Sequence, residues 1–179
     1  MQELKNYDMP TLMRTFTGVF VDPLDLNPRD INIVDIAHAL SNICRFGGHC
    51  PIFYSVAQHC VLCSQMASPN NKLEALMHDA SEAYLSDVPT PIKHRITNYY
   101  DIEDRAMSVI SKKFDFGFPF TEETKHIDKM VLHLEFSNLF DYTLNNIKIK
   151  SPQEAKDEFL STFWTLYSKK INDFKNKLK

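Results

Sequence analysis

An adjacent His78-Asp79 pair closes the apolar run 75–77, and the carboxylate Glu82 follows three residues later. A helix through this segment would place His78 and Glu82 on one face, because residues four apart are neighbours across a helical turn. Asp79 would then lie about 100° around the helix from His78. An imidazole and a carboxylate form a mixed donor set that suits Zn, Co, Mn or Fe(II). Two ligands are too few for a metal site, so this interpretation needs further ligands elsewhere in the chain.

Two further candidate ligands lie on predicted helices. His59 follows the inward stripe of a helix predicted over 54–66, where a histidine is either a core residue with one hydrogen bond or a ligand. Asp128 borders the apolar stripe of a later helix, where an acidic residue is usually solvated or capping. Joined to the His-Asp pair, they would supply two imidazoles and two carboxylates and leave coordination positions for water and substrate.

Such a site would be suited to hydrolysis. A bound divalent ion lowers the pKa of its water, to about 7 in the best-known zinc case, and so supplies hydroxide at neutral pH. Glu82, about one turn from the proposed ligands, could accept the water proton and orient the attack.

Candidate phosphate-binding groups lie on either side of this segment. The loop 44–51 holds the only Gly-Gly pair, and it is either a plain turn with an exposed Arg45 or a loop whose arginine grips a phosphate. Asp87, in the proline-stiffened segment 86–91, is either a turn residue or an acceptor held at the mouth of a site. Together with Arg45, the donors suited to phosphate oxygens are His49 and Lys93. A metal with phosphate grips favours phosphoester hydrolysis.

The composition sets the class of protein. The chain has 179 residues, 44% hydrophobic and 24% charged, which predicts a single globular domain over 1–179. Four glycines cannot build a Walker-type phosphate loop, and a net charge of -3 gives no reason to expect duplex nucleic acid as a partner. No apolar run approaches the ~18 residues of a membrane span, and the first residues lack an apolar signal core. We therefore expect a cytoplasmic protein with no membrane partner and with reduced thiols.

The cysteines leave an alternative. Cys60 and Cys63 form a Cys-x-x-Cys pair, which could hold a structural zinc ion. No second such pair exists in the sequence, and both residues lie in a helical pattern with His59. Ordinary buried thiols are the favoured interpretation.

Hydrophobic periodicity predicts an all-α bundle of six or more helices with a short N-terminal strand or hairpin arm. Residues 1–13 are expected to form a mobile lead-in and 15–21 the strand. Asn32, Ser55 and Thr121 are expected to cap helices. The helices are predicted at 33–43, 54–66, 72–84, 100–114, from Thr121 onward and 153–178, with a polar loop at 141–152. The last is expected to bury Ala155, Phe159, Phe163, Leu166, Ile171 and Phe174.

The four candidate ligands resemble the His…His-Asp…Asp signature of the HD-domain phosphohydrolase superfamily. The segments 41–49, 53–59, 75–84 and 87–93 resemble the YfdR-like proteins. They are also similar to the phage dATP triphosphohydrolases of the DatZ type and, more distantly, to the YfbR-type 5′-deoxynucleotidases. The resemblance covers roughly residues 14–140 and fades in the last helix.

The resemblance implies a role for each matching residue. His59, His78, Asp79 and Asp128 would ligate one divalent transition metal ion (Zn, Co or Mn), with a second ion near His49 or Glu82 as the alternative. Glu82 would be the catalytic acid/base. Arg45 and Lys93 would contact phosphate, Phe46 would lie beside the sugar or base, and Asp87 would crowd a 2′-hydroxyl and so favour deoxyribose. For His49 only proximity carries over. We also expect the strand segment with Gly18 and Phe20 to fold over the site and line the base pocket.

The expected function is therefore a metal-dependent hydrolase of the 5′-phosphates of deoxynucleotides. A dATP or dNTP triphosphohydrolase that also accepts dADP and dAMP is favoured, and a general 5′-deoxynucleoside monophosphatase is the alternative within this class. A non-catalytic nucleotide-binding sensor is the alternative of another class, although Glu82 argues against it because a pure binder needs no water-activating carboxylate. Relatives commonly form homo-oligomers, which we expect here.

Overall fold

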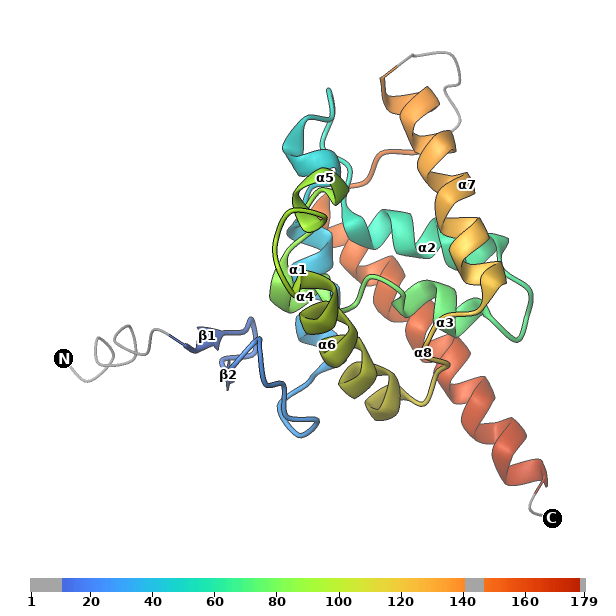
Figure 1. The fold of residues 1–179 in the computed structure, drawn as a ribbon. Helices are drawn as coiled ribbons and strands as arrows, with labels where there is room; N and C mark the ends of the chain where they lie inside the picture. The colour runs from blue at the N-terminus through green and yellow to red at the C-terminus, as the bar shows by residue number, and fades with distance from the viewer. Residues whose placement is uncertain (1–10, 141–146, 178–179) are drawn as a thin grey trace.

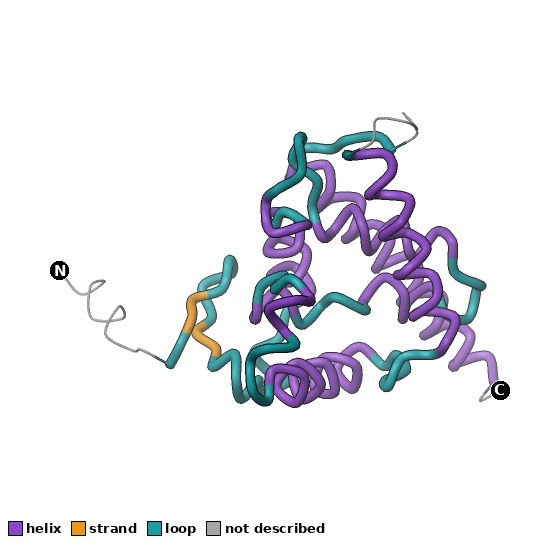
Figure 2. The backbone as a smooth tube through the Cα atoms, turned by 45° about the horizontal axis from the view of Figure 1, so that its top comes forward, coloured by secondary structure: helices purple, strands orange, loops and turns teal. Residues whose placement is uncertain are grey.

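The computed structural model describes residues 11–140 and 147–177 and confirms an all-α bundle with a short N-terminal hairpin (Figure 1). The hairpin pairs β1 (Met13–Arg14) antiparallel with β2 (Phe20–Val21), and Figure 2 shows these strands beside the otherwise helical chain. The helices that follow are α1 (Ile33–Asn42), the 3-10 turn η2 (Phe46–Gly48), α2 (Val56–Met66), α3 (Lys72–Met77), α4 (Glu82–Leu85), α5 (Thr90–Lys93), α6 (Tyr99–Phe114), α7 (Glu122–Leu139) and α8 (Pro152–Lys177).

The predicted helix caps are confirmed. The side chain of Asn32 accepts a hydrogen bond from the amide of Val34, which fixes the start of α1. Ser55 and Thr121 do the same for α2 and α7. Each cap satisfies an amide that the first helical turn leaves without a partner, and contributes about 1 kcal/mol.

Helix α2 lies at the centre of the bundle. It packs against α1, α3, α7 and α8, and most of its residues are buried. The main apolar cluster extends from Val21 of the hairpin to Phe163 of α8. A polar side chain on α2 is therefore removed from water unless it faces a cavity, and His59 lies on this helix. That residues 1–179 form a single domain stays a prediction.

The segment 15–21, predicted as a short strand or hairpin arm, belongs to the hairpin, but only its end, Phe20–Val21, is a strand. Residues Thr15 to Val19 form the hairpin turn, in which the amide of Thr15 donates to the carbonyl of Val19 and Gly18 adopts a φ of +94°. The left-handed backbone at Gly18 reverses the chain. Met13 already pairs with Val21, so the hairpin begins inside the range expected for the lead-in, and residues 1–10 lie outside the described residues.

The helix predicted over 72–84 is interrupted at its chemically important point. It ends at Met77, and α4 begins at Glu82 after a tight turn in which the amide of Glu82 donates to the carbonyl of Asp79. In a continuous helix the amide of Asp79 would donate to Ala75, but His78 Nδ1 lies 2.8 Å from that carbonyl oxygen and takes the bond. His78 and Glu82 therefore do not share one face of a continuous helix.

Other parts of the chain also differ from the predictions or lie outside the described residues. Ile171 and Phe174 were predicted to be buried, but they are 39% and 64% exposed because α8 projects past the rest of the bundle (Figure 1). Pro91, expected only to break structure, lies in the short helix α5. Of the loop predicted over 141–152, residues 141–146 lie outside the described part, as does the predicted end of the last helix at Leu178. None of the described helices is both long and apolar enough to cross a membrane.

Candidate metal centre

Four polar side chains from three parts of the chain meet between α2 and α7. His59 Nε2, on α2, lies 3.2 Å from His78 Nε2 and 3.1 Å from Asp128 Oδ1 on α7. Asp79 completes the group, with Oδ1 3.2 Å from His78 Nε2 and Oδ2 3.6 Å from His59 Nε2. Two ligand atoms bound to one zinc ion at tetrahedral angles are about 3.3 Å apart. The structure thus brings the four predicted ligands together at spacings that suit a single cation.

The two histidines present the ring nitrogen that a cation needs. A carbonyl oxygen can only accept, so His78 Nδ1 carries a proton and donates it to Ala75, which leaves the Nε2 lone pair facing the cluster. His59 Nδ1 lies 2.8 Å from Glu135 Oε1 and is held in the same tautomer by that carboxylate. Two lone pairs that face each other beside two carboxylates require a proton or a cation between them.

The pKa values of the two histidines and of Asp128 also indicate a site that attracts positive charge. Burial and the nearby Arg45 lower the pKa of His59, but Glu135 and Asp128 outweigh them and hold it well above its ordinary value. Burial also lowers the pKa of His78, which Asp79 and Asp128 raise well above normal. Burial raises the pKa of Asp128, yet its bonds to the two imidazoles leave it far below the usual range. The site is strongly attractive to positive charge, whether it is filled by protons or by a metal ion.

Glu82 lies buried beside this group. Burial raises its pKa well above the ordinary value, and the negative charges of Asp79 and Asp87 raise it further. Lys93 Nζ, 3.7 Å from Glu82 Oε1, lowers it only in part. Glu82 Oε2 is buried and has no hydrogen-bond partner within the described part of the chain. Such a carboxyl group is suited to exchanging a proton with a bound water or substrate.

Arg45 is placed to reach the cluster. The interpretation of a plain turn with an exposed arginine was wrong, because Arg45 is buried. Its Nε lies 3.0 Å from Glu135 Oε2 and its Nη1 3.7 Å from Asp79 Oδ2. Asp87 is half-buried nearby, and burial together with Asp79 raises its pKa despite the opposing charge of Arg45. The guanidinium therefore lies between the proposed metal ligands and the segment predicted to contact the sugar.

The remaining residues predicted to contact substrate differ in their surroundings. Lys93 is held by Glu103, 2.6 Å away, and lines the same cavity as His78. Phe46 packs edge-on against Phe140 at 5.2 Å between ring centroids. His49 is exposed at the end of η2, and no hydrogen bond or ion pair joins it to the cluster among the described residues.

The prediction that Gly18 and Phe20 line a base pocket over the site is not supported by the structure. Thr17 donates from its amide and its hydroxyl to the two carboxylate oxygens of Asp35 on α1, both at 2.7 Å. These bonds hold the hairpin against α1, and no contact within 11–140 and 147–177 joins Gly18 or Phe20 to the cluster. The hairpin lies apart from α7 in Figure 1.

Comparison with known proteins shows the family to which this chain belongs. No protein-family model matches this sequence. YfdR of Escherichia coli K12, named as an uncharacterized protein, is 43% identical over 129 residues, or 72% of each chain. This chain belongs to the YfdR family. An uncharacterized protein of Rhodobacter capsulatus is 36% identical over 116 residues, which make up 59% of this chain and 58% of that protein. The names of these relatives assign no activity, so membership of the HD-domain superfamily stays a hypothesis for this YfdR-family chain.

Cys60 and Cys63, predicted from the sequence to be ordinary buried thiols, lie beside the four predicted ligands. Cys63 Sγ lies 3.6 Å from His59 Nε2. Two overlapping groups of described residues could hold a metal ion, one of them His59, Cys63 and His78, the other Cys60, His78 and Asp79. Burial raises the pKa of the Cys60 thiol to about 11, so this thiol is neutral at pH 7 and the carboxylates are the better anionic donors. The residues of this part of the chain can thus hold a divalent metal.

Sequence reasoning missed the role of Glu135. The structure buries Glu135 completely against His59 and Arg45. A spacing of seven residues places Asp128 and Glu135 on the same face of α7, about two turns apart, and this was the available signal.

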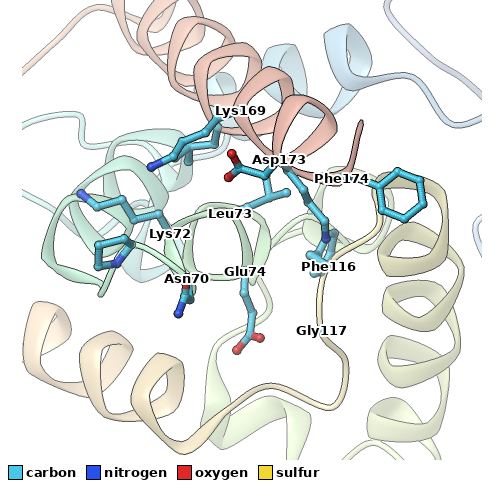
Figure 3. A pocket seen from close by; sticks show the side chains of 12 residues that line it. Asn70, Lys72, Leu73, Glu74, Phe116, Gly117, Lys169, Asp173 and Phe174 are labelled. Atoms are coloured by element: carbon cyan, nitrogen blue, oxygen red, sulfur yellow. The ribbon is translucent and has the colours of Figure 1, made fainter. Parts of the chain in front are cut away.

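Two cavities differ in their relation to this site. A cavity of about 300 Å³ is lined by His78, Asp79 and Asp128, with Lys93 on its wall, and gives access to the cluster. A larger one of about 510 Å³ lies between α3 and α8 (Figure 3), with Glu74 and Lys169 in its lining. We assign the site to the smaller cavity, because the lining of the larger one contains no histidine or cysteine.

Proposed function

We propose that this YfdR-family protein is a metal-dependent phosphohydrolase that acts on the 5′-phosphate groups of deoxynucleotides. The observation that carries the proposal is the convergence of His59, His78, Asp79 and Asp128 on one point next to Glu82, whose Oε2 has no hydrogen-bond partner among the described residues. Two imidazoles and two carboxylates would leave one or two positions for water and substrate on a five- or six-coordinate ion, and an open cavity lies beside them.

The four ligands would hold one Zn, Co or Mn ion, which fits their mixed nitrogen and oxygen donors better than a set built on thiols. When bound, this ion would lower the pKa of a water molecule and polarise a phosphate oxygen. A second ion is not needed by the proposal, since His49 is exposed and does not approach the cluster among the described residues.

The chain's own residues would divide the remaining work. Glu82 would take the proton of the attacking water, because burial and the charges of Asp79 and Asp87 raise its pKa and so make the carboxylate more basic. Arg45 would donate to the phosphate oxygens and oppose the charge that grows on them in the transition state. Lys93, whose pKa is raised by Glu103 despite its burial, stays charged and would hold a further phosphate oxygen.

Asp87 would distinguish deoxyribose from ribose. Its half-buried carboxylate lies near the charge of Arg45, and a 2′-hydroxyl placed against it would crowd it. Phe46 would cover the sugar or the base. We favour dATP-type triphosphates, with release of the phosphate chain and with dADP and dAMP as further substrates. The subunits are proposed to assemble as a homo-oligomer in the cytoplasm.

The alternative within the class is a general 5′-deoxynucleoside monophosphatase, and the alternative outside it is a nucleotide sensor. Glu82 favours an enzyme over a sensor, because its buried Oε2 has no hydrogen-bond partner among the described residues, which is costly, and a binding module has no use for a water-activating carboxylate.

The test is a product analysis on the full chain. The protein is stripped of metal with a chelator, reloaded with Co²⁺, Mn²⁺ or Zn²⁺, and incubated with dAMP, dADP, dATP, dTTP and ATP. We expect a deoxynucleoside plus phosphate, diphosphate or triphosphate, with ATP cleaved more slowly than dATP. Release of phosphate from dAMP alone would select the monophosphatase. No release with any metal, together with tight nucleotide binding, would select the sensor.

A further inference from the structure

We infer that Glu135 is a positioning residue that fixes both a metal ligand and the phosphate-binding arginine, so that metal binding and phosphate binding depend on one buried carboxylate. The inference rests on the proposed function for the role of Arg45, but its metal part can be measured without any hydrolysis.

Glu135 bridges His59 and Arg45 through its two carboxylate oxygens. Its side chain has no exposed surface. One oxygen, Oε1, lies 2.8 Å from His59 Nδ1, and the other, Oε2, lies 3.0 Å from Arg45 Nε. A buried carboxylate is costly unless charged or hydrogen-bonding partners surround it, and here each oxygen has a donor of its own.

The bond to His59 decides which ring nitrogen can bind a cation. A carboxylate accepts the Nδ1 proton and thereby leaves the Nε2 lone pair free, and it also raises the basicity of the ring. Without it, the proton could move to Nε2, and His59 would turn a donor instead of a lone pair toward His78 and Asp128.

The bond to Arg45 decides which face of the guanidinium is free. Because Nε is occupied by Glu135, the two terminal nitrogens remain for a ligand, and Nη1 already points toward the cluster at 3.7 Å from Asp79 Oδ2. The two terminal nitrogens form the fork that matches two oxygens of a phosphate group.

Helix α7 makes the arrangement rigid. It supplies the proposed ligand Asp128 and, about two turns later, Glu135, so both contacts are fixed to one frame. A shift of Glu135 would displace His59 and Arg45 together, and we therefore expect the two binding functions to be lost together.

The experiment compares Glu135→Gln with the wild-type full chain. The amide leaves a single acceptor where two donors converge, so one of the two bonds must be lost. We expect Co²⁺ affinity, measured by competition with a chromophoric chelator, to fall about 10- to 100-fold. The visible absorption bands of bound Co²⁺ should shift, and at saturating Co²⁺ the KM for a deoxynucleotide should rise more than kcat falls.

Glu123→Gln is the matched control. Glu123 lies on the same helix and accepts hydrogen bonds only in a structural setting, from Ser68 and Asn71. This variant should lower thermal stability and leave Co²⁺ affinity and the Co²⁺ spectrum unchanged. A folded Glu135→Gln protein that behaves like this control would overturn the inference, whether or not the wild type hydrolyses nucleotides.

A measurement on the wild type covers the case in which Glu135→Gln does not fold. In zinc-loaded protein with ¹⁵N-labelled histidine, NMR should show His59 protonated at Nδ1 and ligated through Nε2. Ligation through Nδ1 would contradict the role of Glu135. Failure of the proposed function would look different, with unchanged metal and NMR results but no hydrolysis by the wild type.

Discussion

Two cavities among the described residues, one of about 510 Å³ and one of about 300 Å³, show that size does not identify the site. The larger, between α3 and α8, has a buried carboxylate in its lining, Glu74, whose Oε1 accepts the amide and the hydroxyl of Thr121 at 2.7 and 2.8 Å. The smaller opens on His78, Asp79 and Asp128, and His78 Nε2 lies 3.2 Å from Asp79 Oδ1 and 3.7 Å from Asp128 Oδ1. The polar groups of the first join α3 to the start of α7, whereas those of the second could hold a metal ion.

The backbone around the two carboxylate regions reflects the same difference. Gly117 packs so closely that a Cβ there would approach Glu74 Oε2 to 2.6 Å, as expected for a fixed structural contact. At the other region, the helix is interrupted between Met77 and Glu82, and the turn presents His78 and Asp79 to the cavity. We therefore expect substitutions in the first region to affect stability and those in the second to affect chemistry.

The largest effect should come from His78→Ala. Loss of one ligand should weaken Co²⁺ binding below detection and lower kcat/KM by about 10³-fold or more, because the metal contributes several kcal/mol to the transition state. Calorimetric titration measures the Co²⁺ affinity, and a phosphate-release assay measures kcat/KM. A His78→Ala protein that keeps full activity would remove the cluster from the mechanism.

Glu82→Gln should separate catalysis from metal binding. The amide preserves the shape but cannot accept the water proton, so we expect kcat to fall about 10²- to 10⁴-fold. Co²⁺ affinity should stay within a small factor of wild type, because Glu82 is not among the four converging ligands. Normal turnover by a metal-loaded Glu82→Gln protein would show that another group moves the proton.

Metal affinity should depend on pH. The pKa values of His59 and His78 lie well above normal in the metal-free protein, where their carboxylate neighbours outweigh burial. Protons therefore compete with the metal, and the apparent affinity should fall as the pH is lowered, by up to about tenfold per pH unit for each proton displaced. Calorimetry in buffers of different ionisation enthalpy would detect the released protons. A pH-independent affinity would mean that the imidazoles are already neutral.

Glu74→Gln should have the smallest effect on activity. An uncharged amide oxygen accepts the two bonds from Thr121 less strongly than the carboxylate does, so we expect the free energy of unfolding to fall by about 1–3 kcal/mol in urea denaturation. Metal affinity and kcat/KM should equal those of the wild type. A loss of activity in this variant would mean that the larger cavity takes part in the reaction.

Local signals in the sequence predicted much of the fold. Caps at Asn32, Ser55 and Thr121 and a 3.6-residue period placed the starts of three helices correctly. The same period could not show that His78 would take the carbonyl of Ala75 and interrupt its helix. The period gives the face of a helix but not the length of the helices packed against it, so it predicts burial for Ile171 and Phe174, which are exposed.

Contacts between distant residues limited the prediction of the site. The motif predicted the four residues that the structure brings together, although their binding of metal stays a prediction. The position of Gly18 and Phe20 depended on bonds between Thr17 and Asp35, 18 residues apart, which no local pattern reveals. The role of Glu135 depended on its contact with Arg45, 90 residues away in sequence.

The most direct test of the central claim is the location of the metal itself. A crystal of the full chain grown with Co²⁺ and measured at the cobalt absorption edge should show one anomalous peak per chain. The peak should lie about 2.0–2.2 Å from His59 Nε2, His78 Nε2 and an oxygen of Asp79 and of Asp128, near the distances known for zinc. A peak on the thiols of Cys60 or Cys63, or none at this point in metal-saturated protein, would contradict the account.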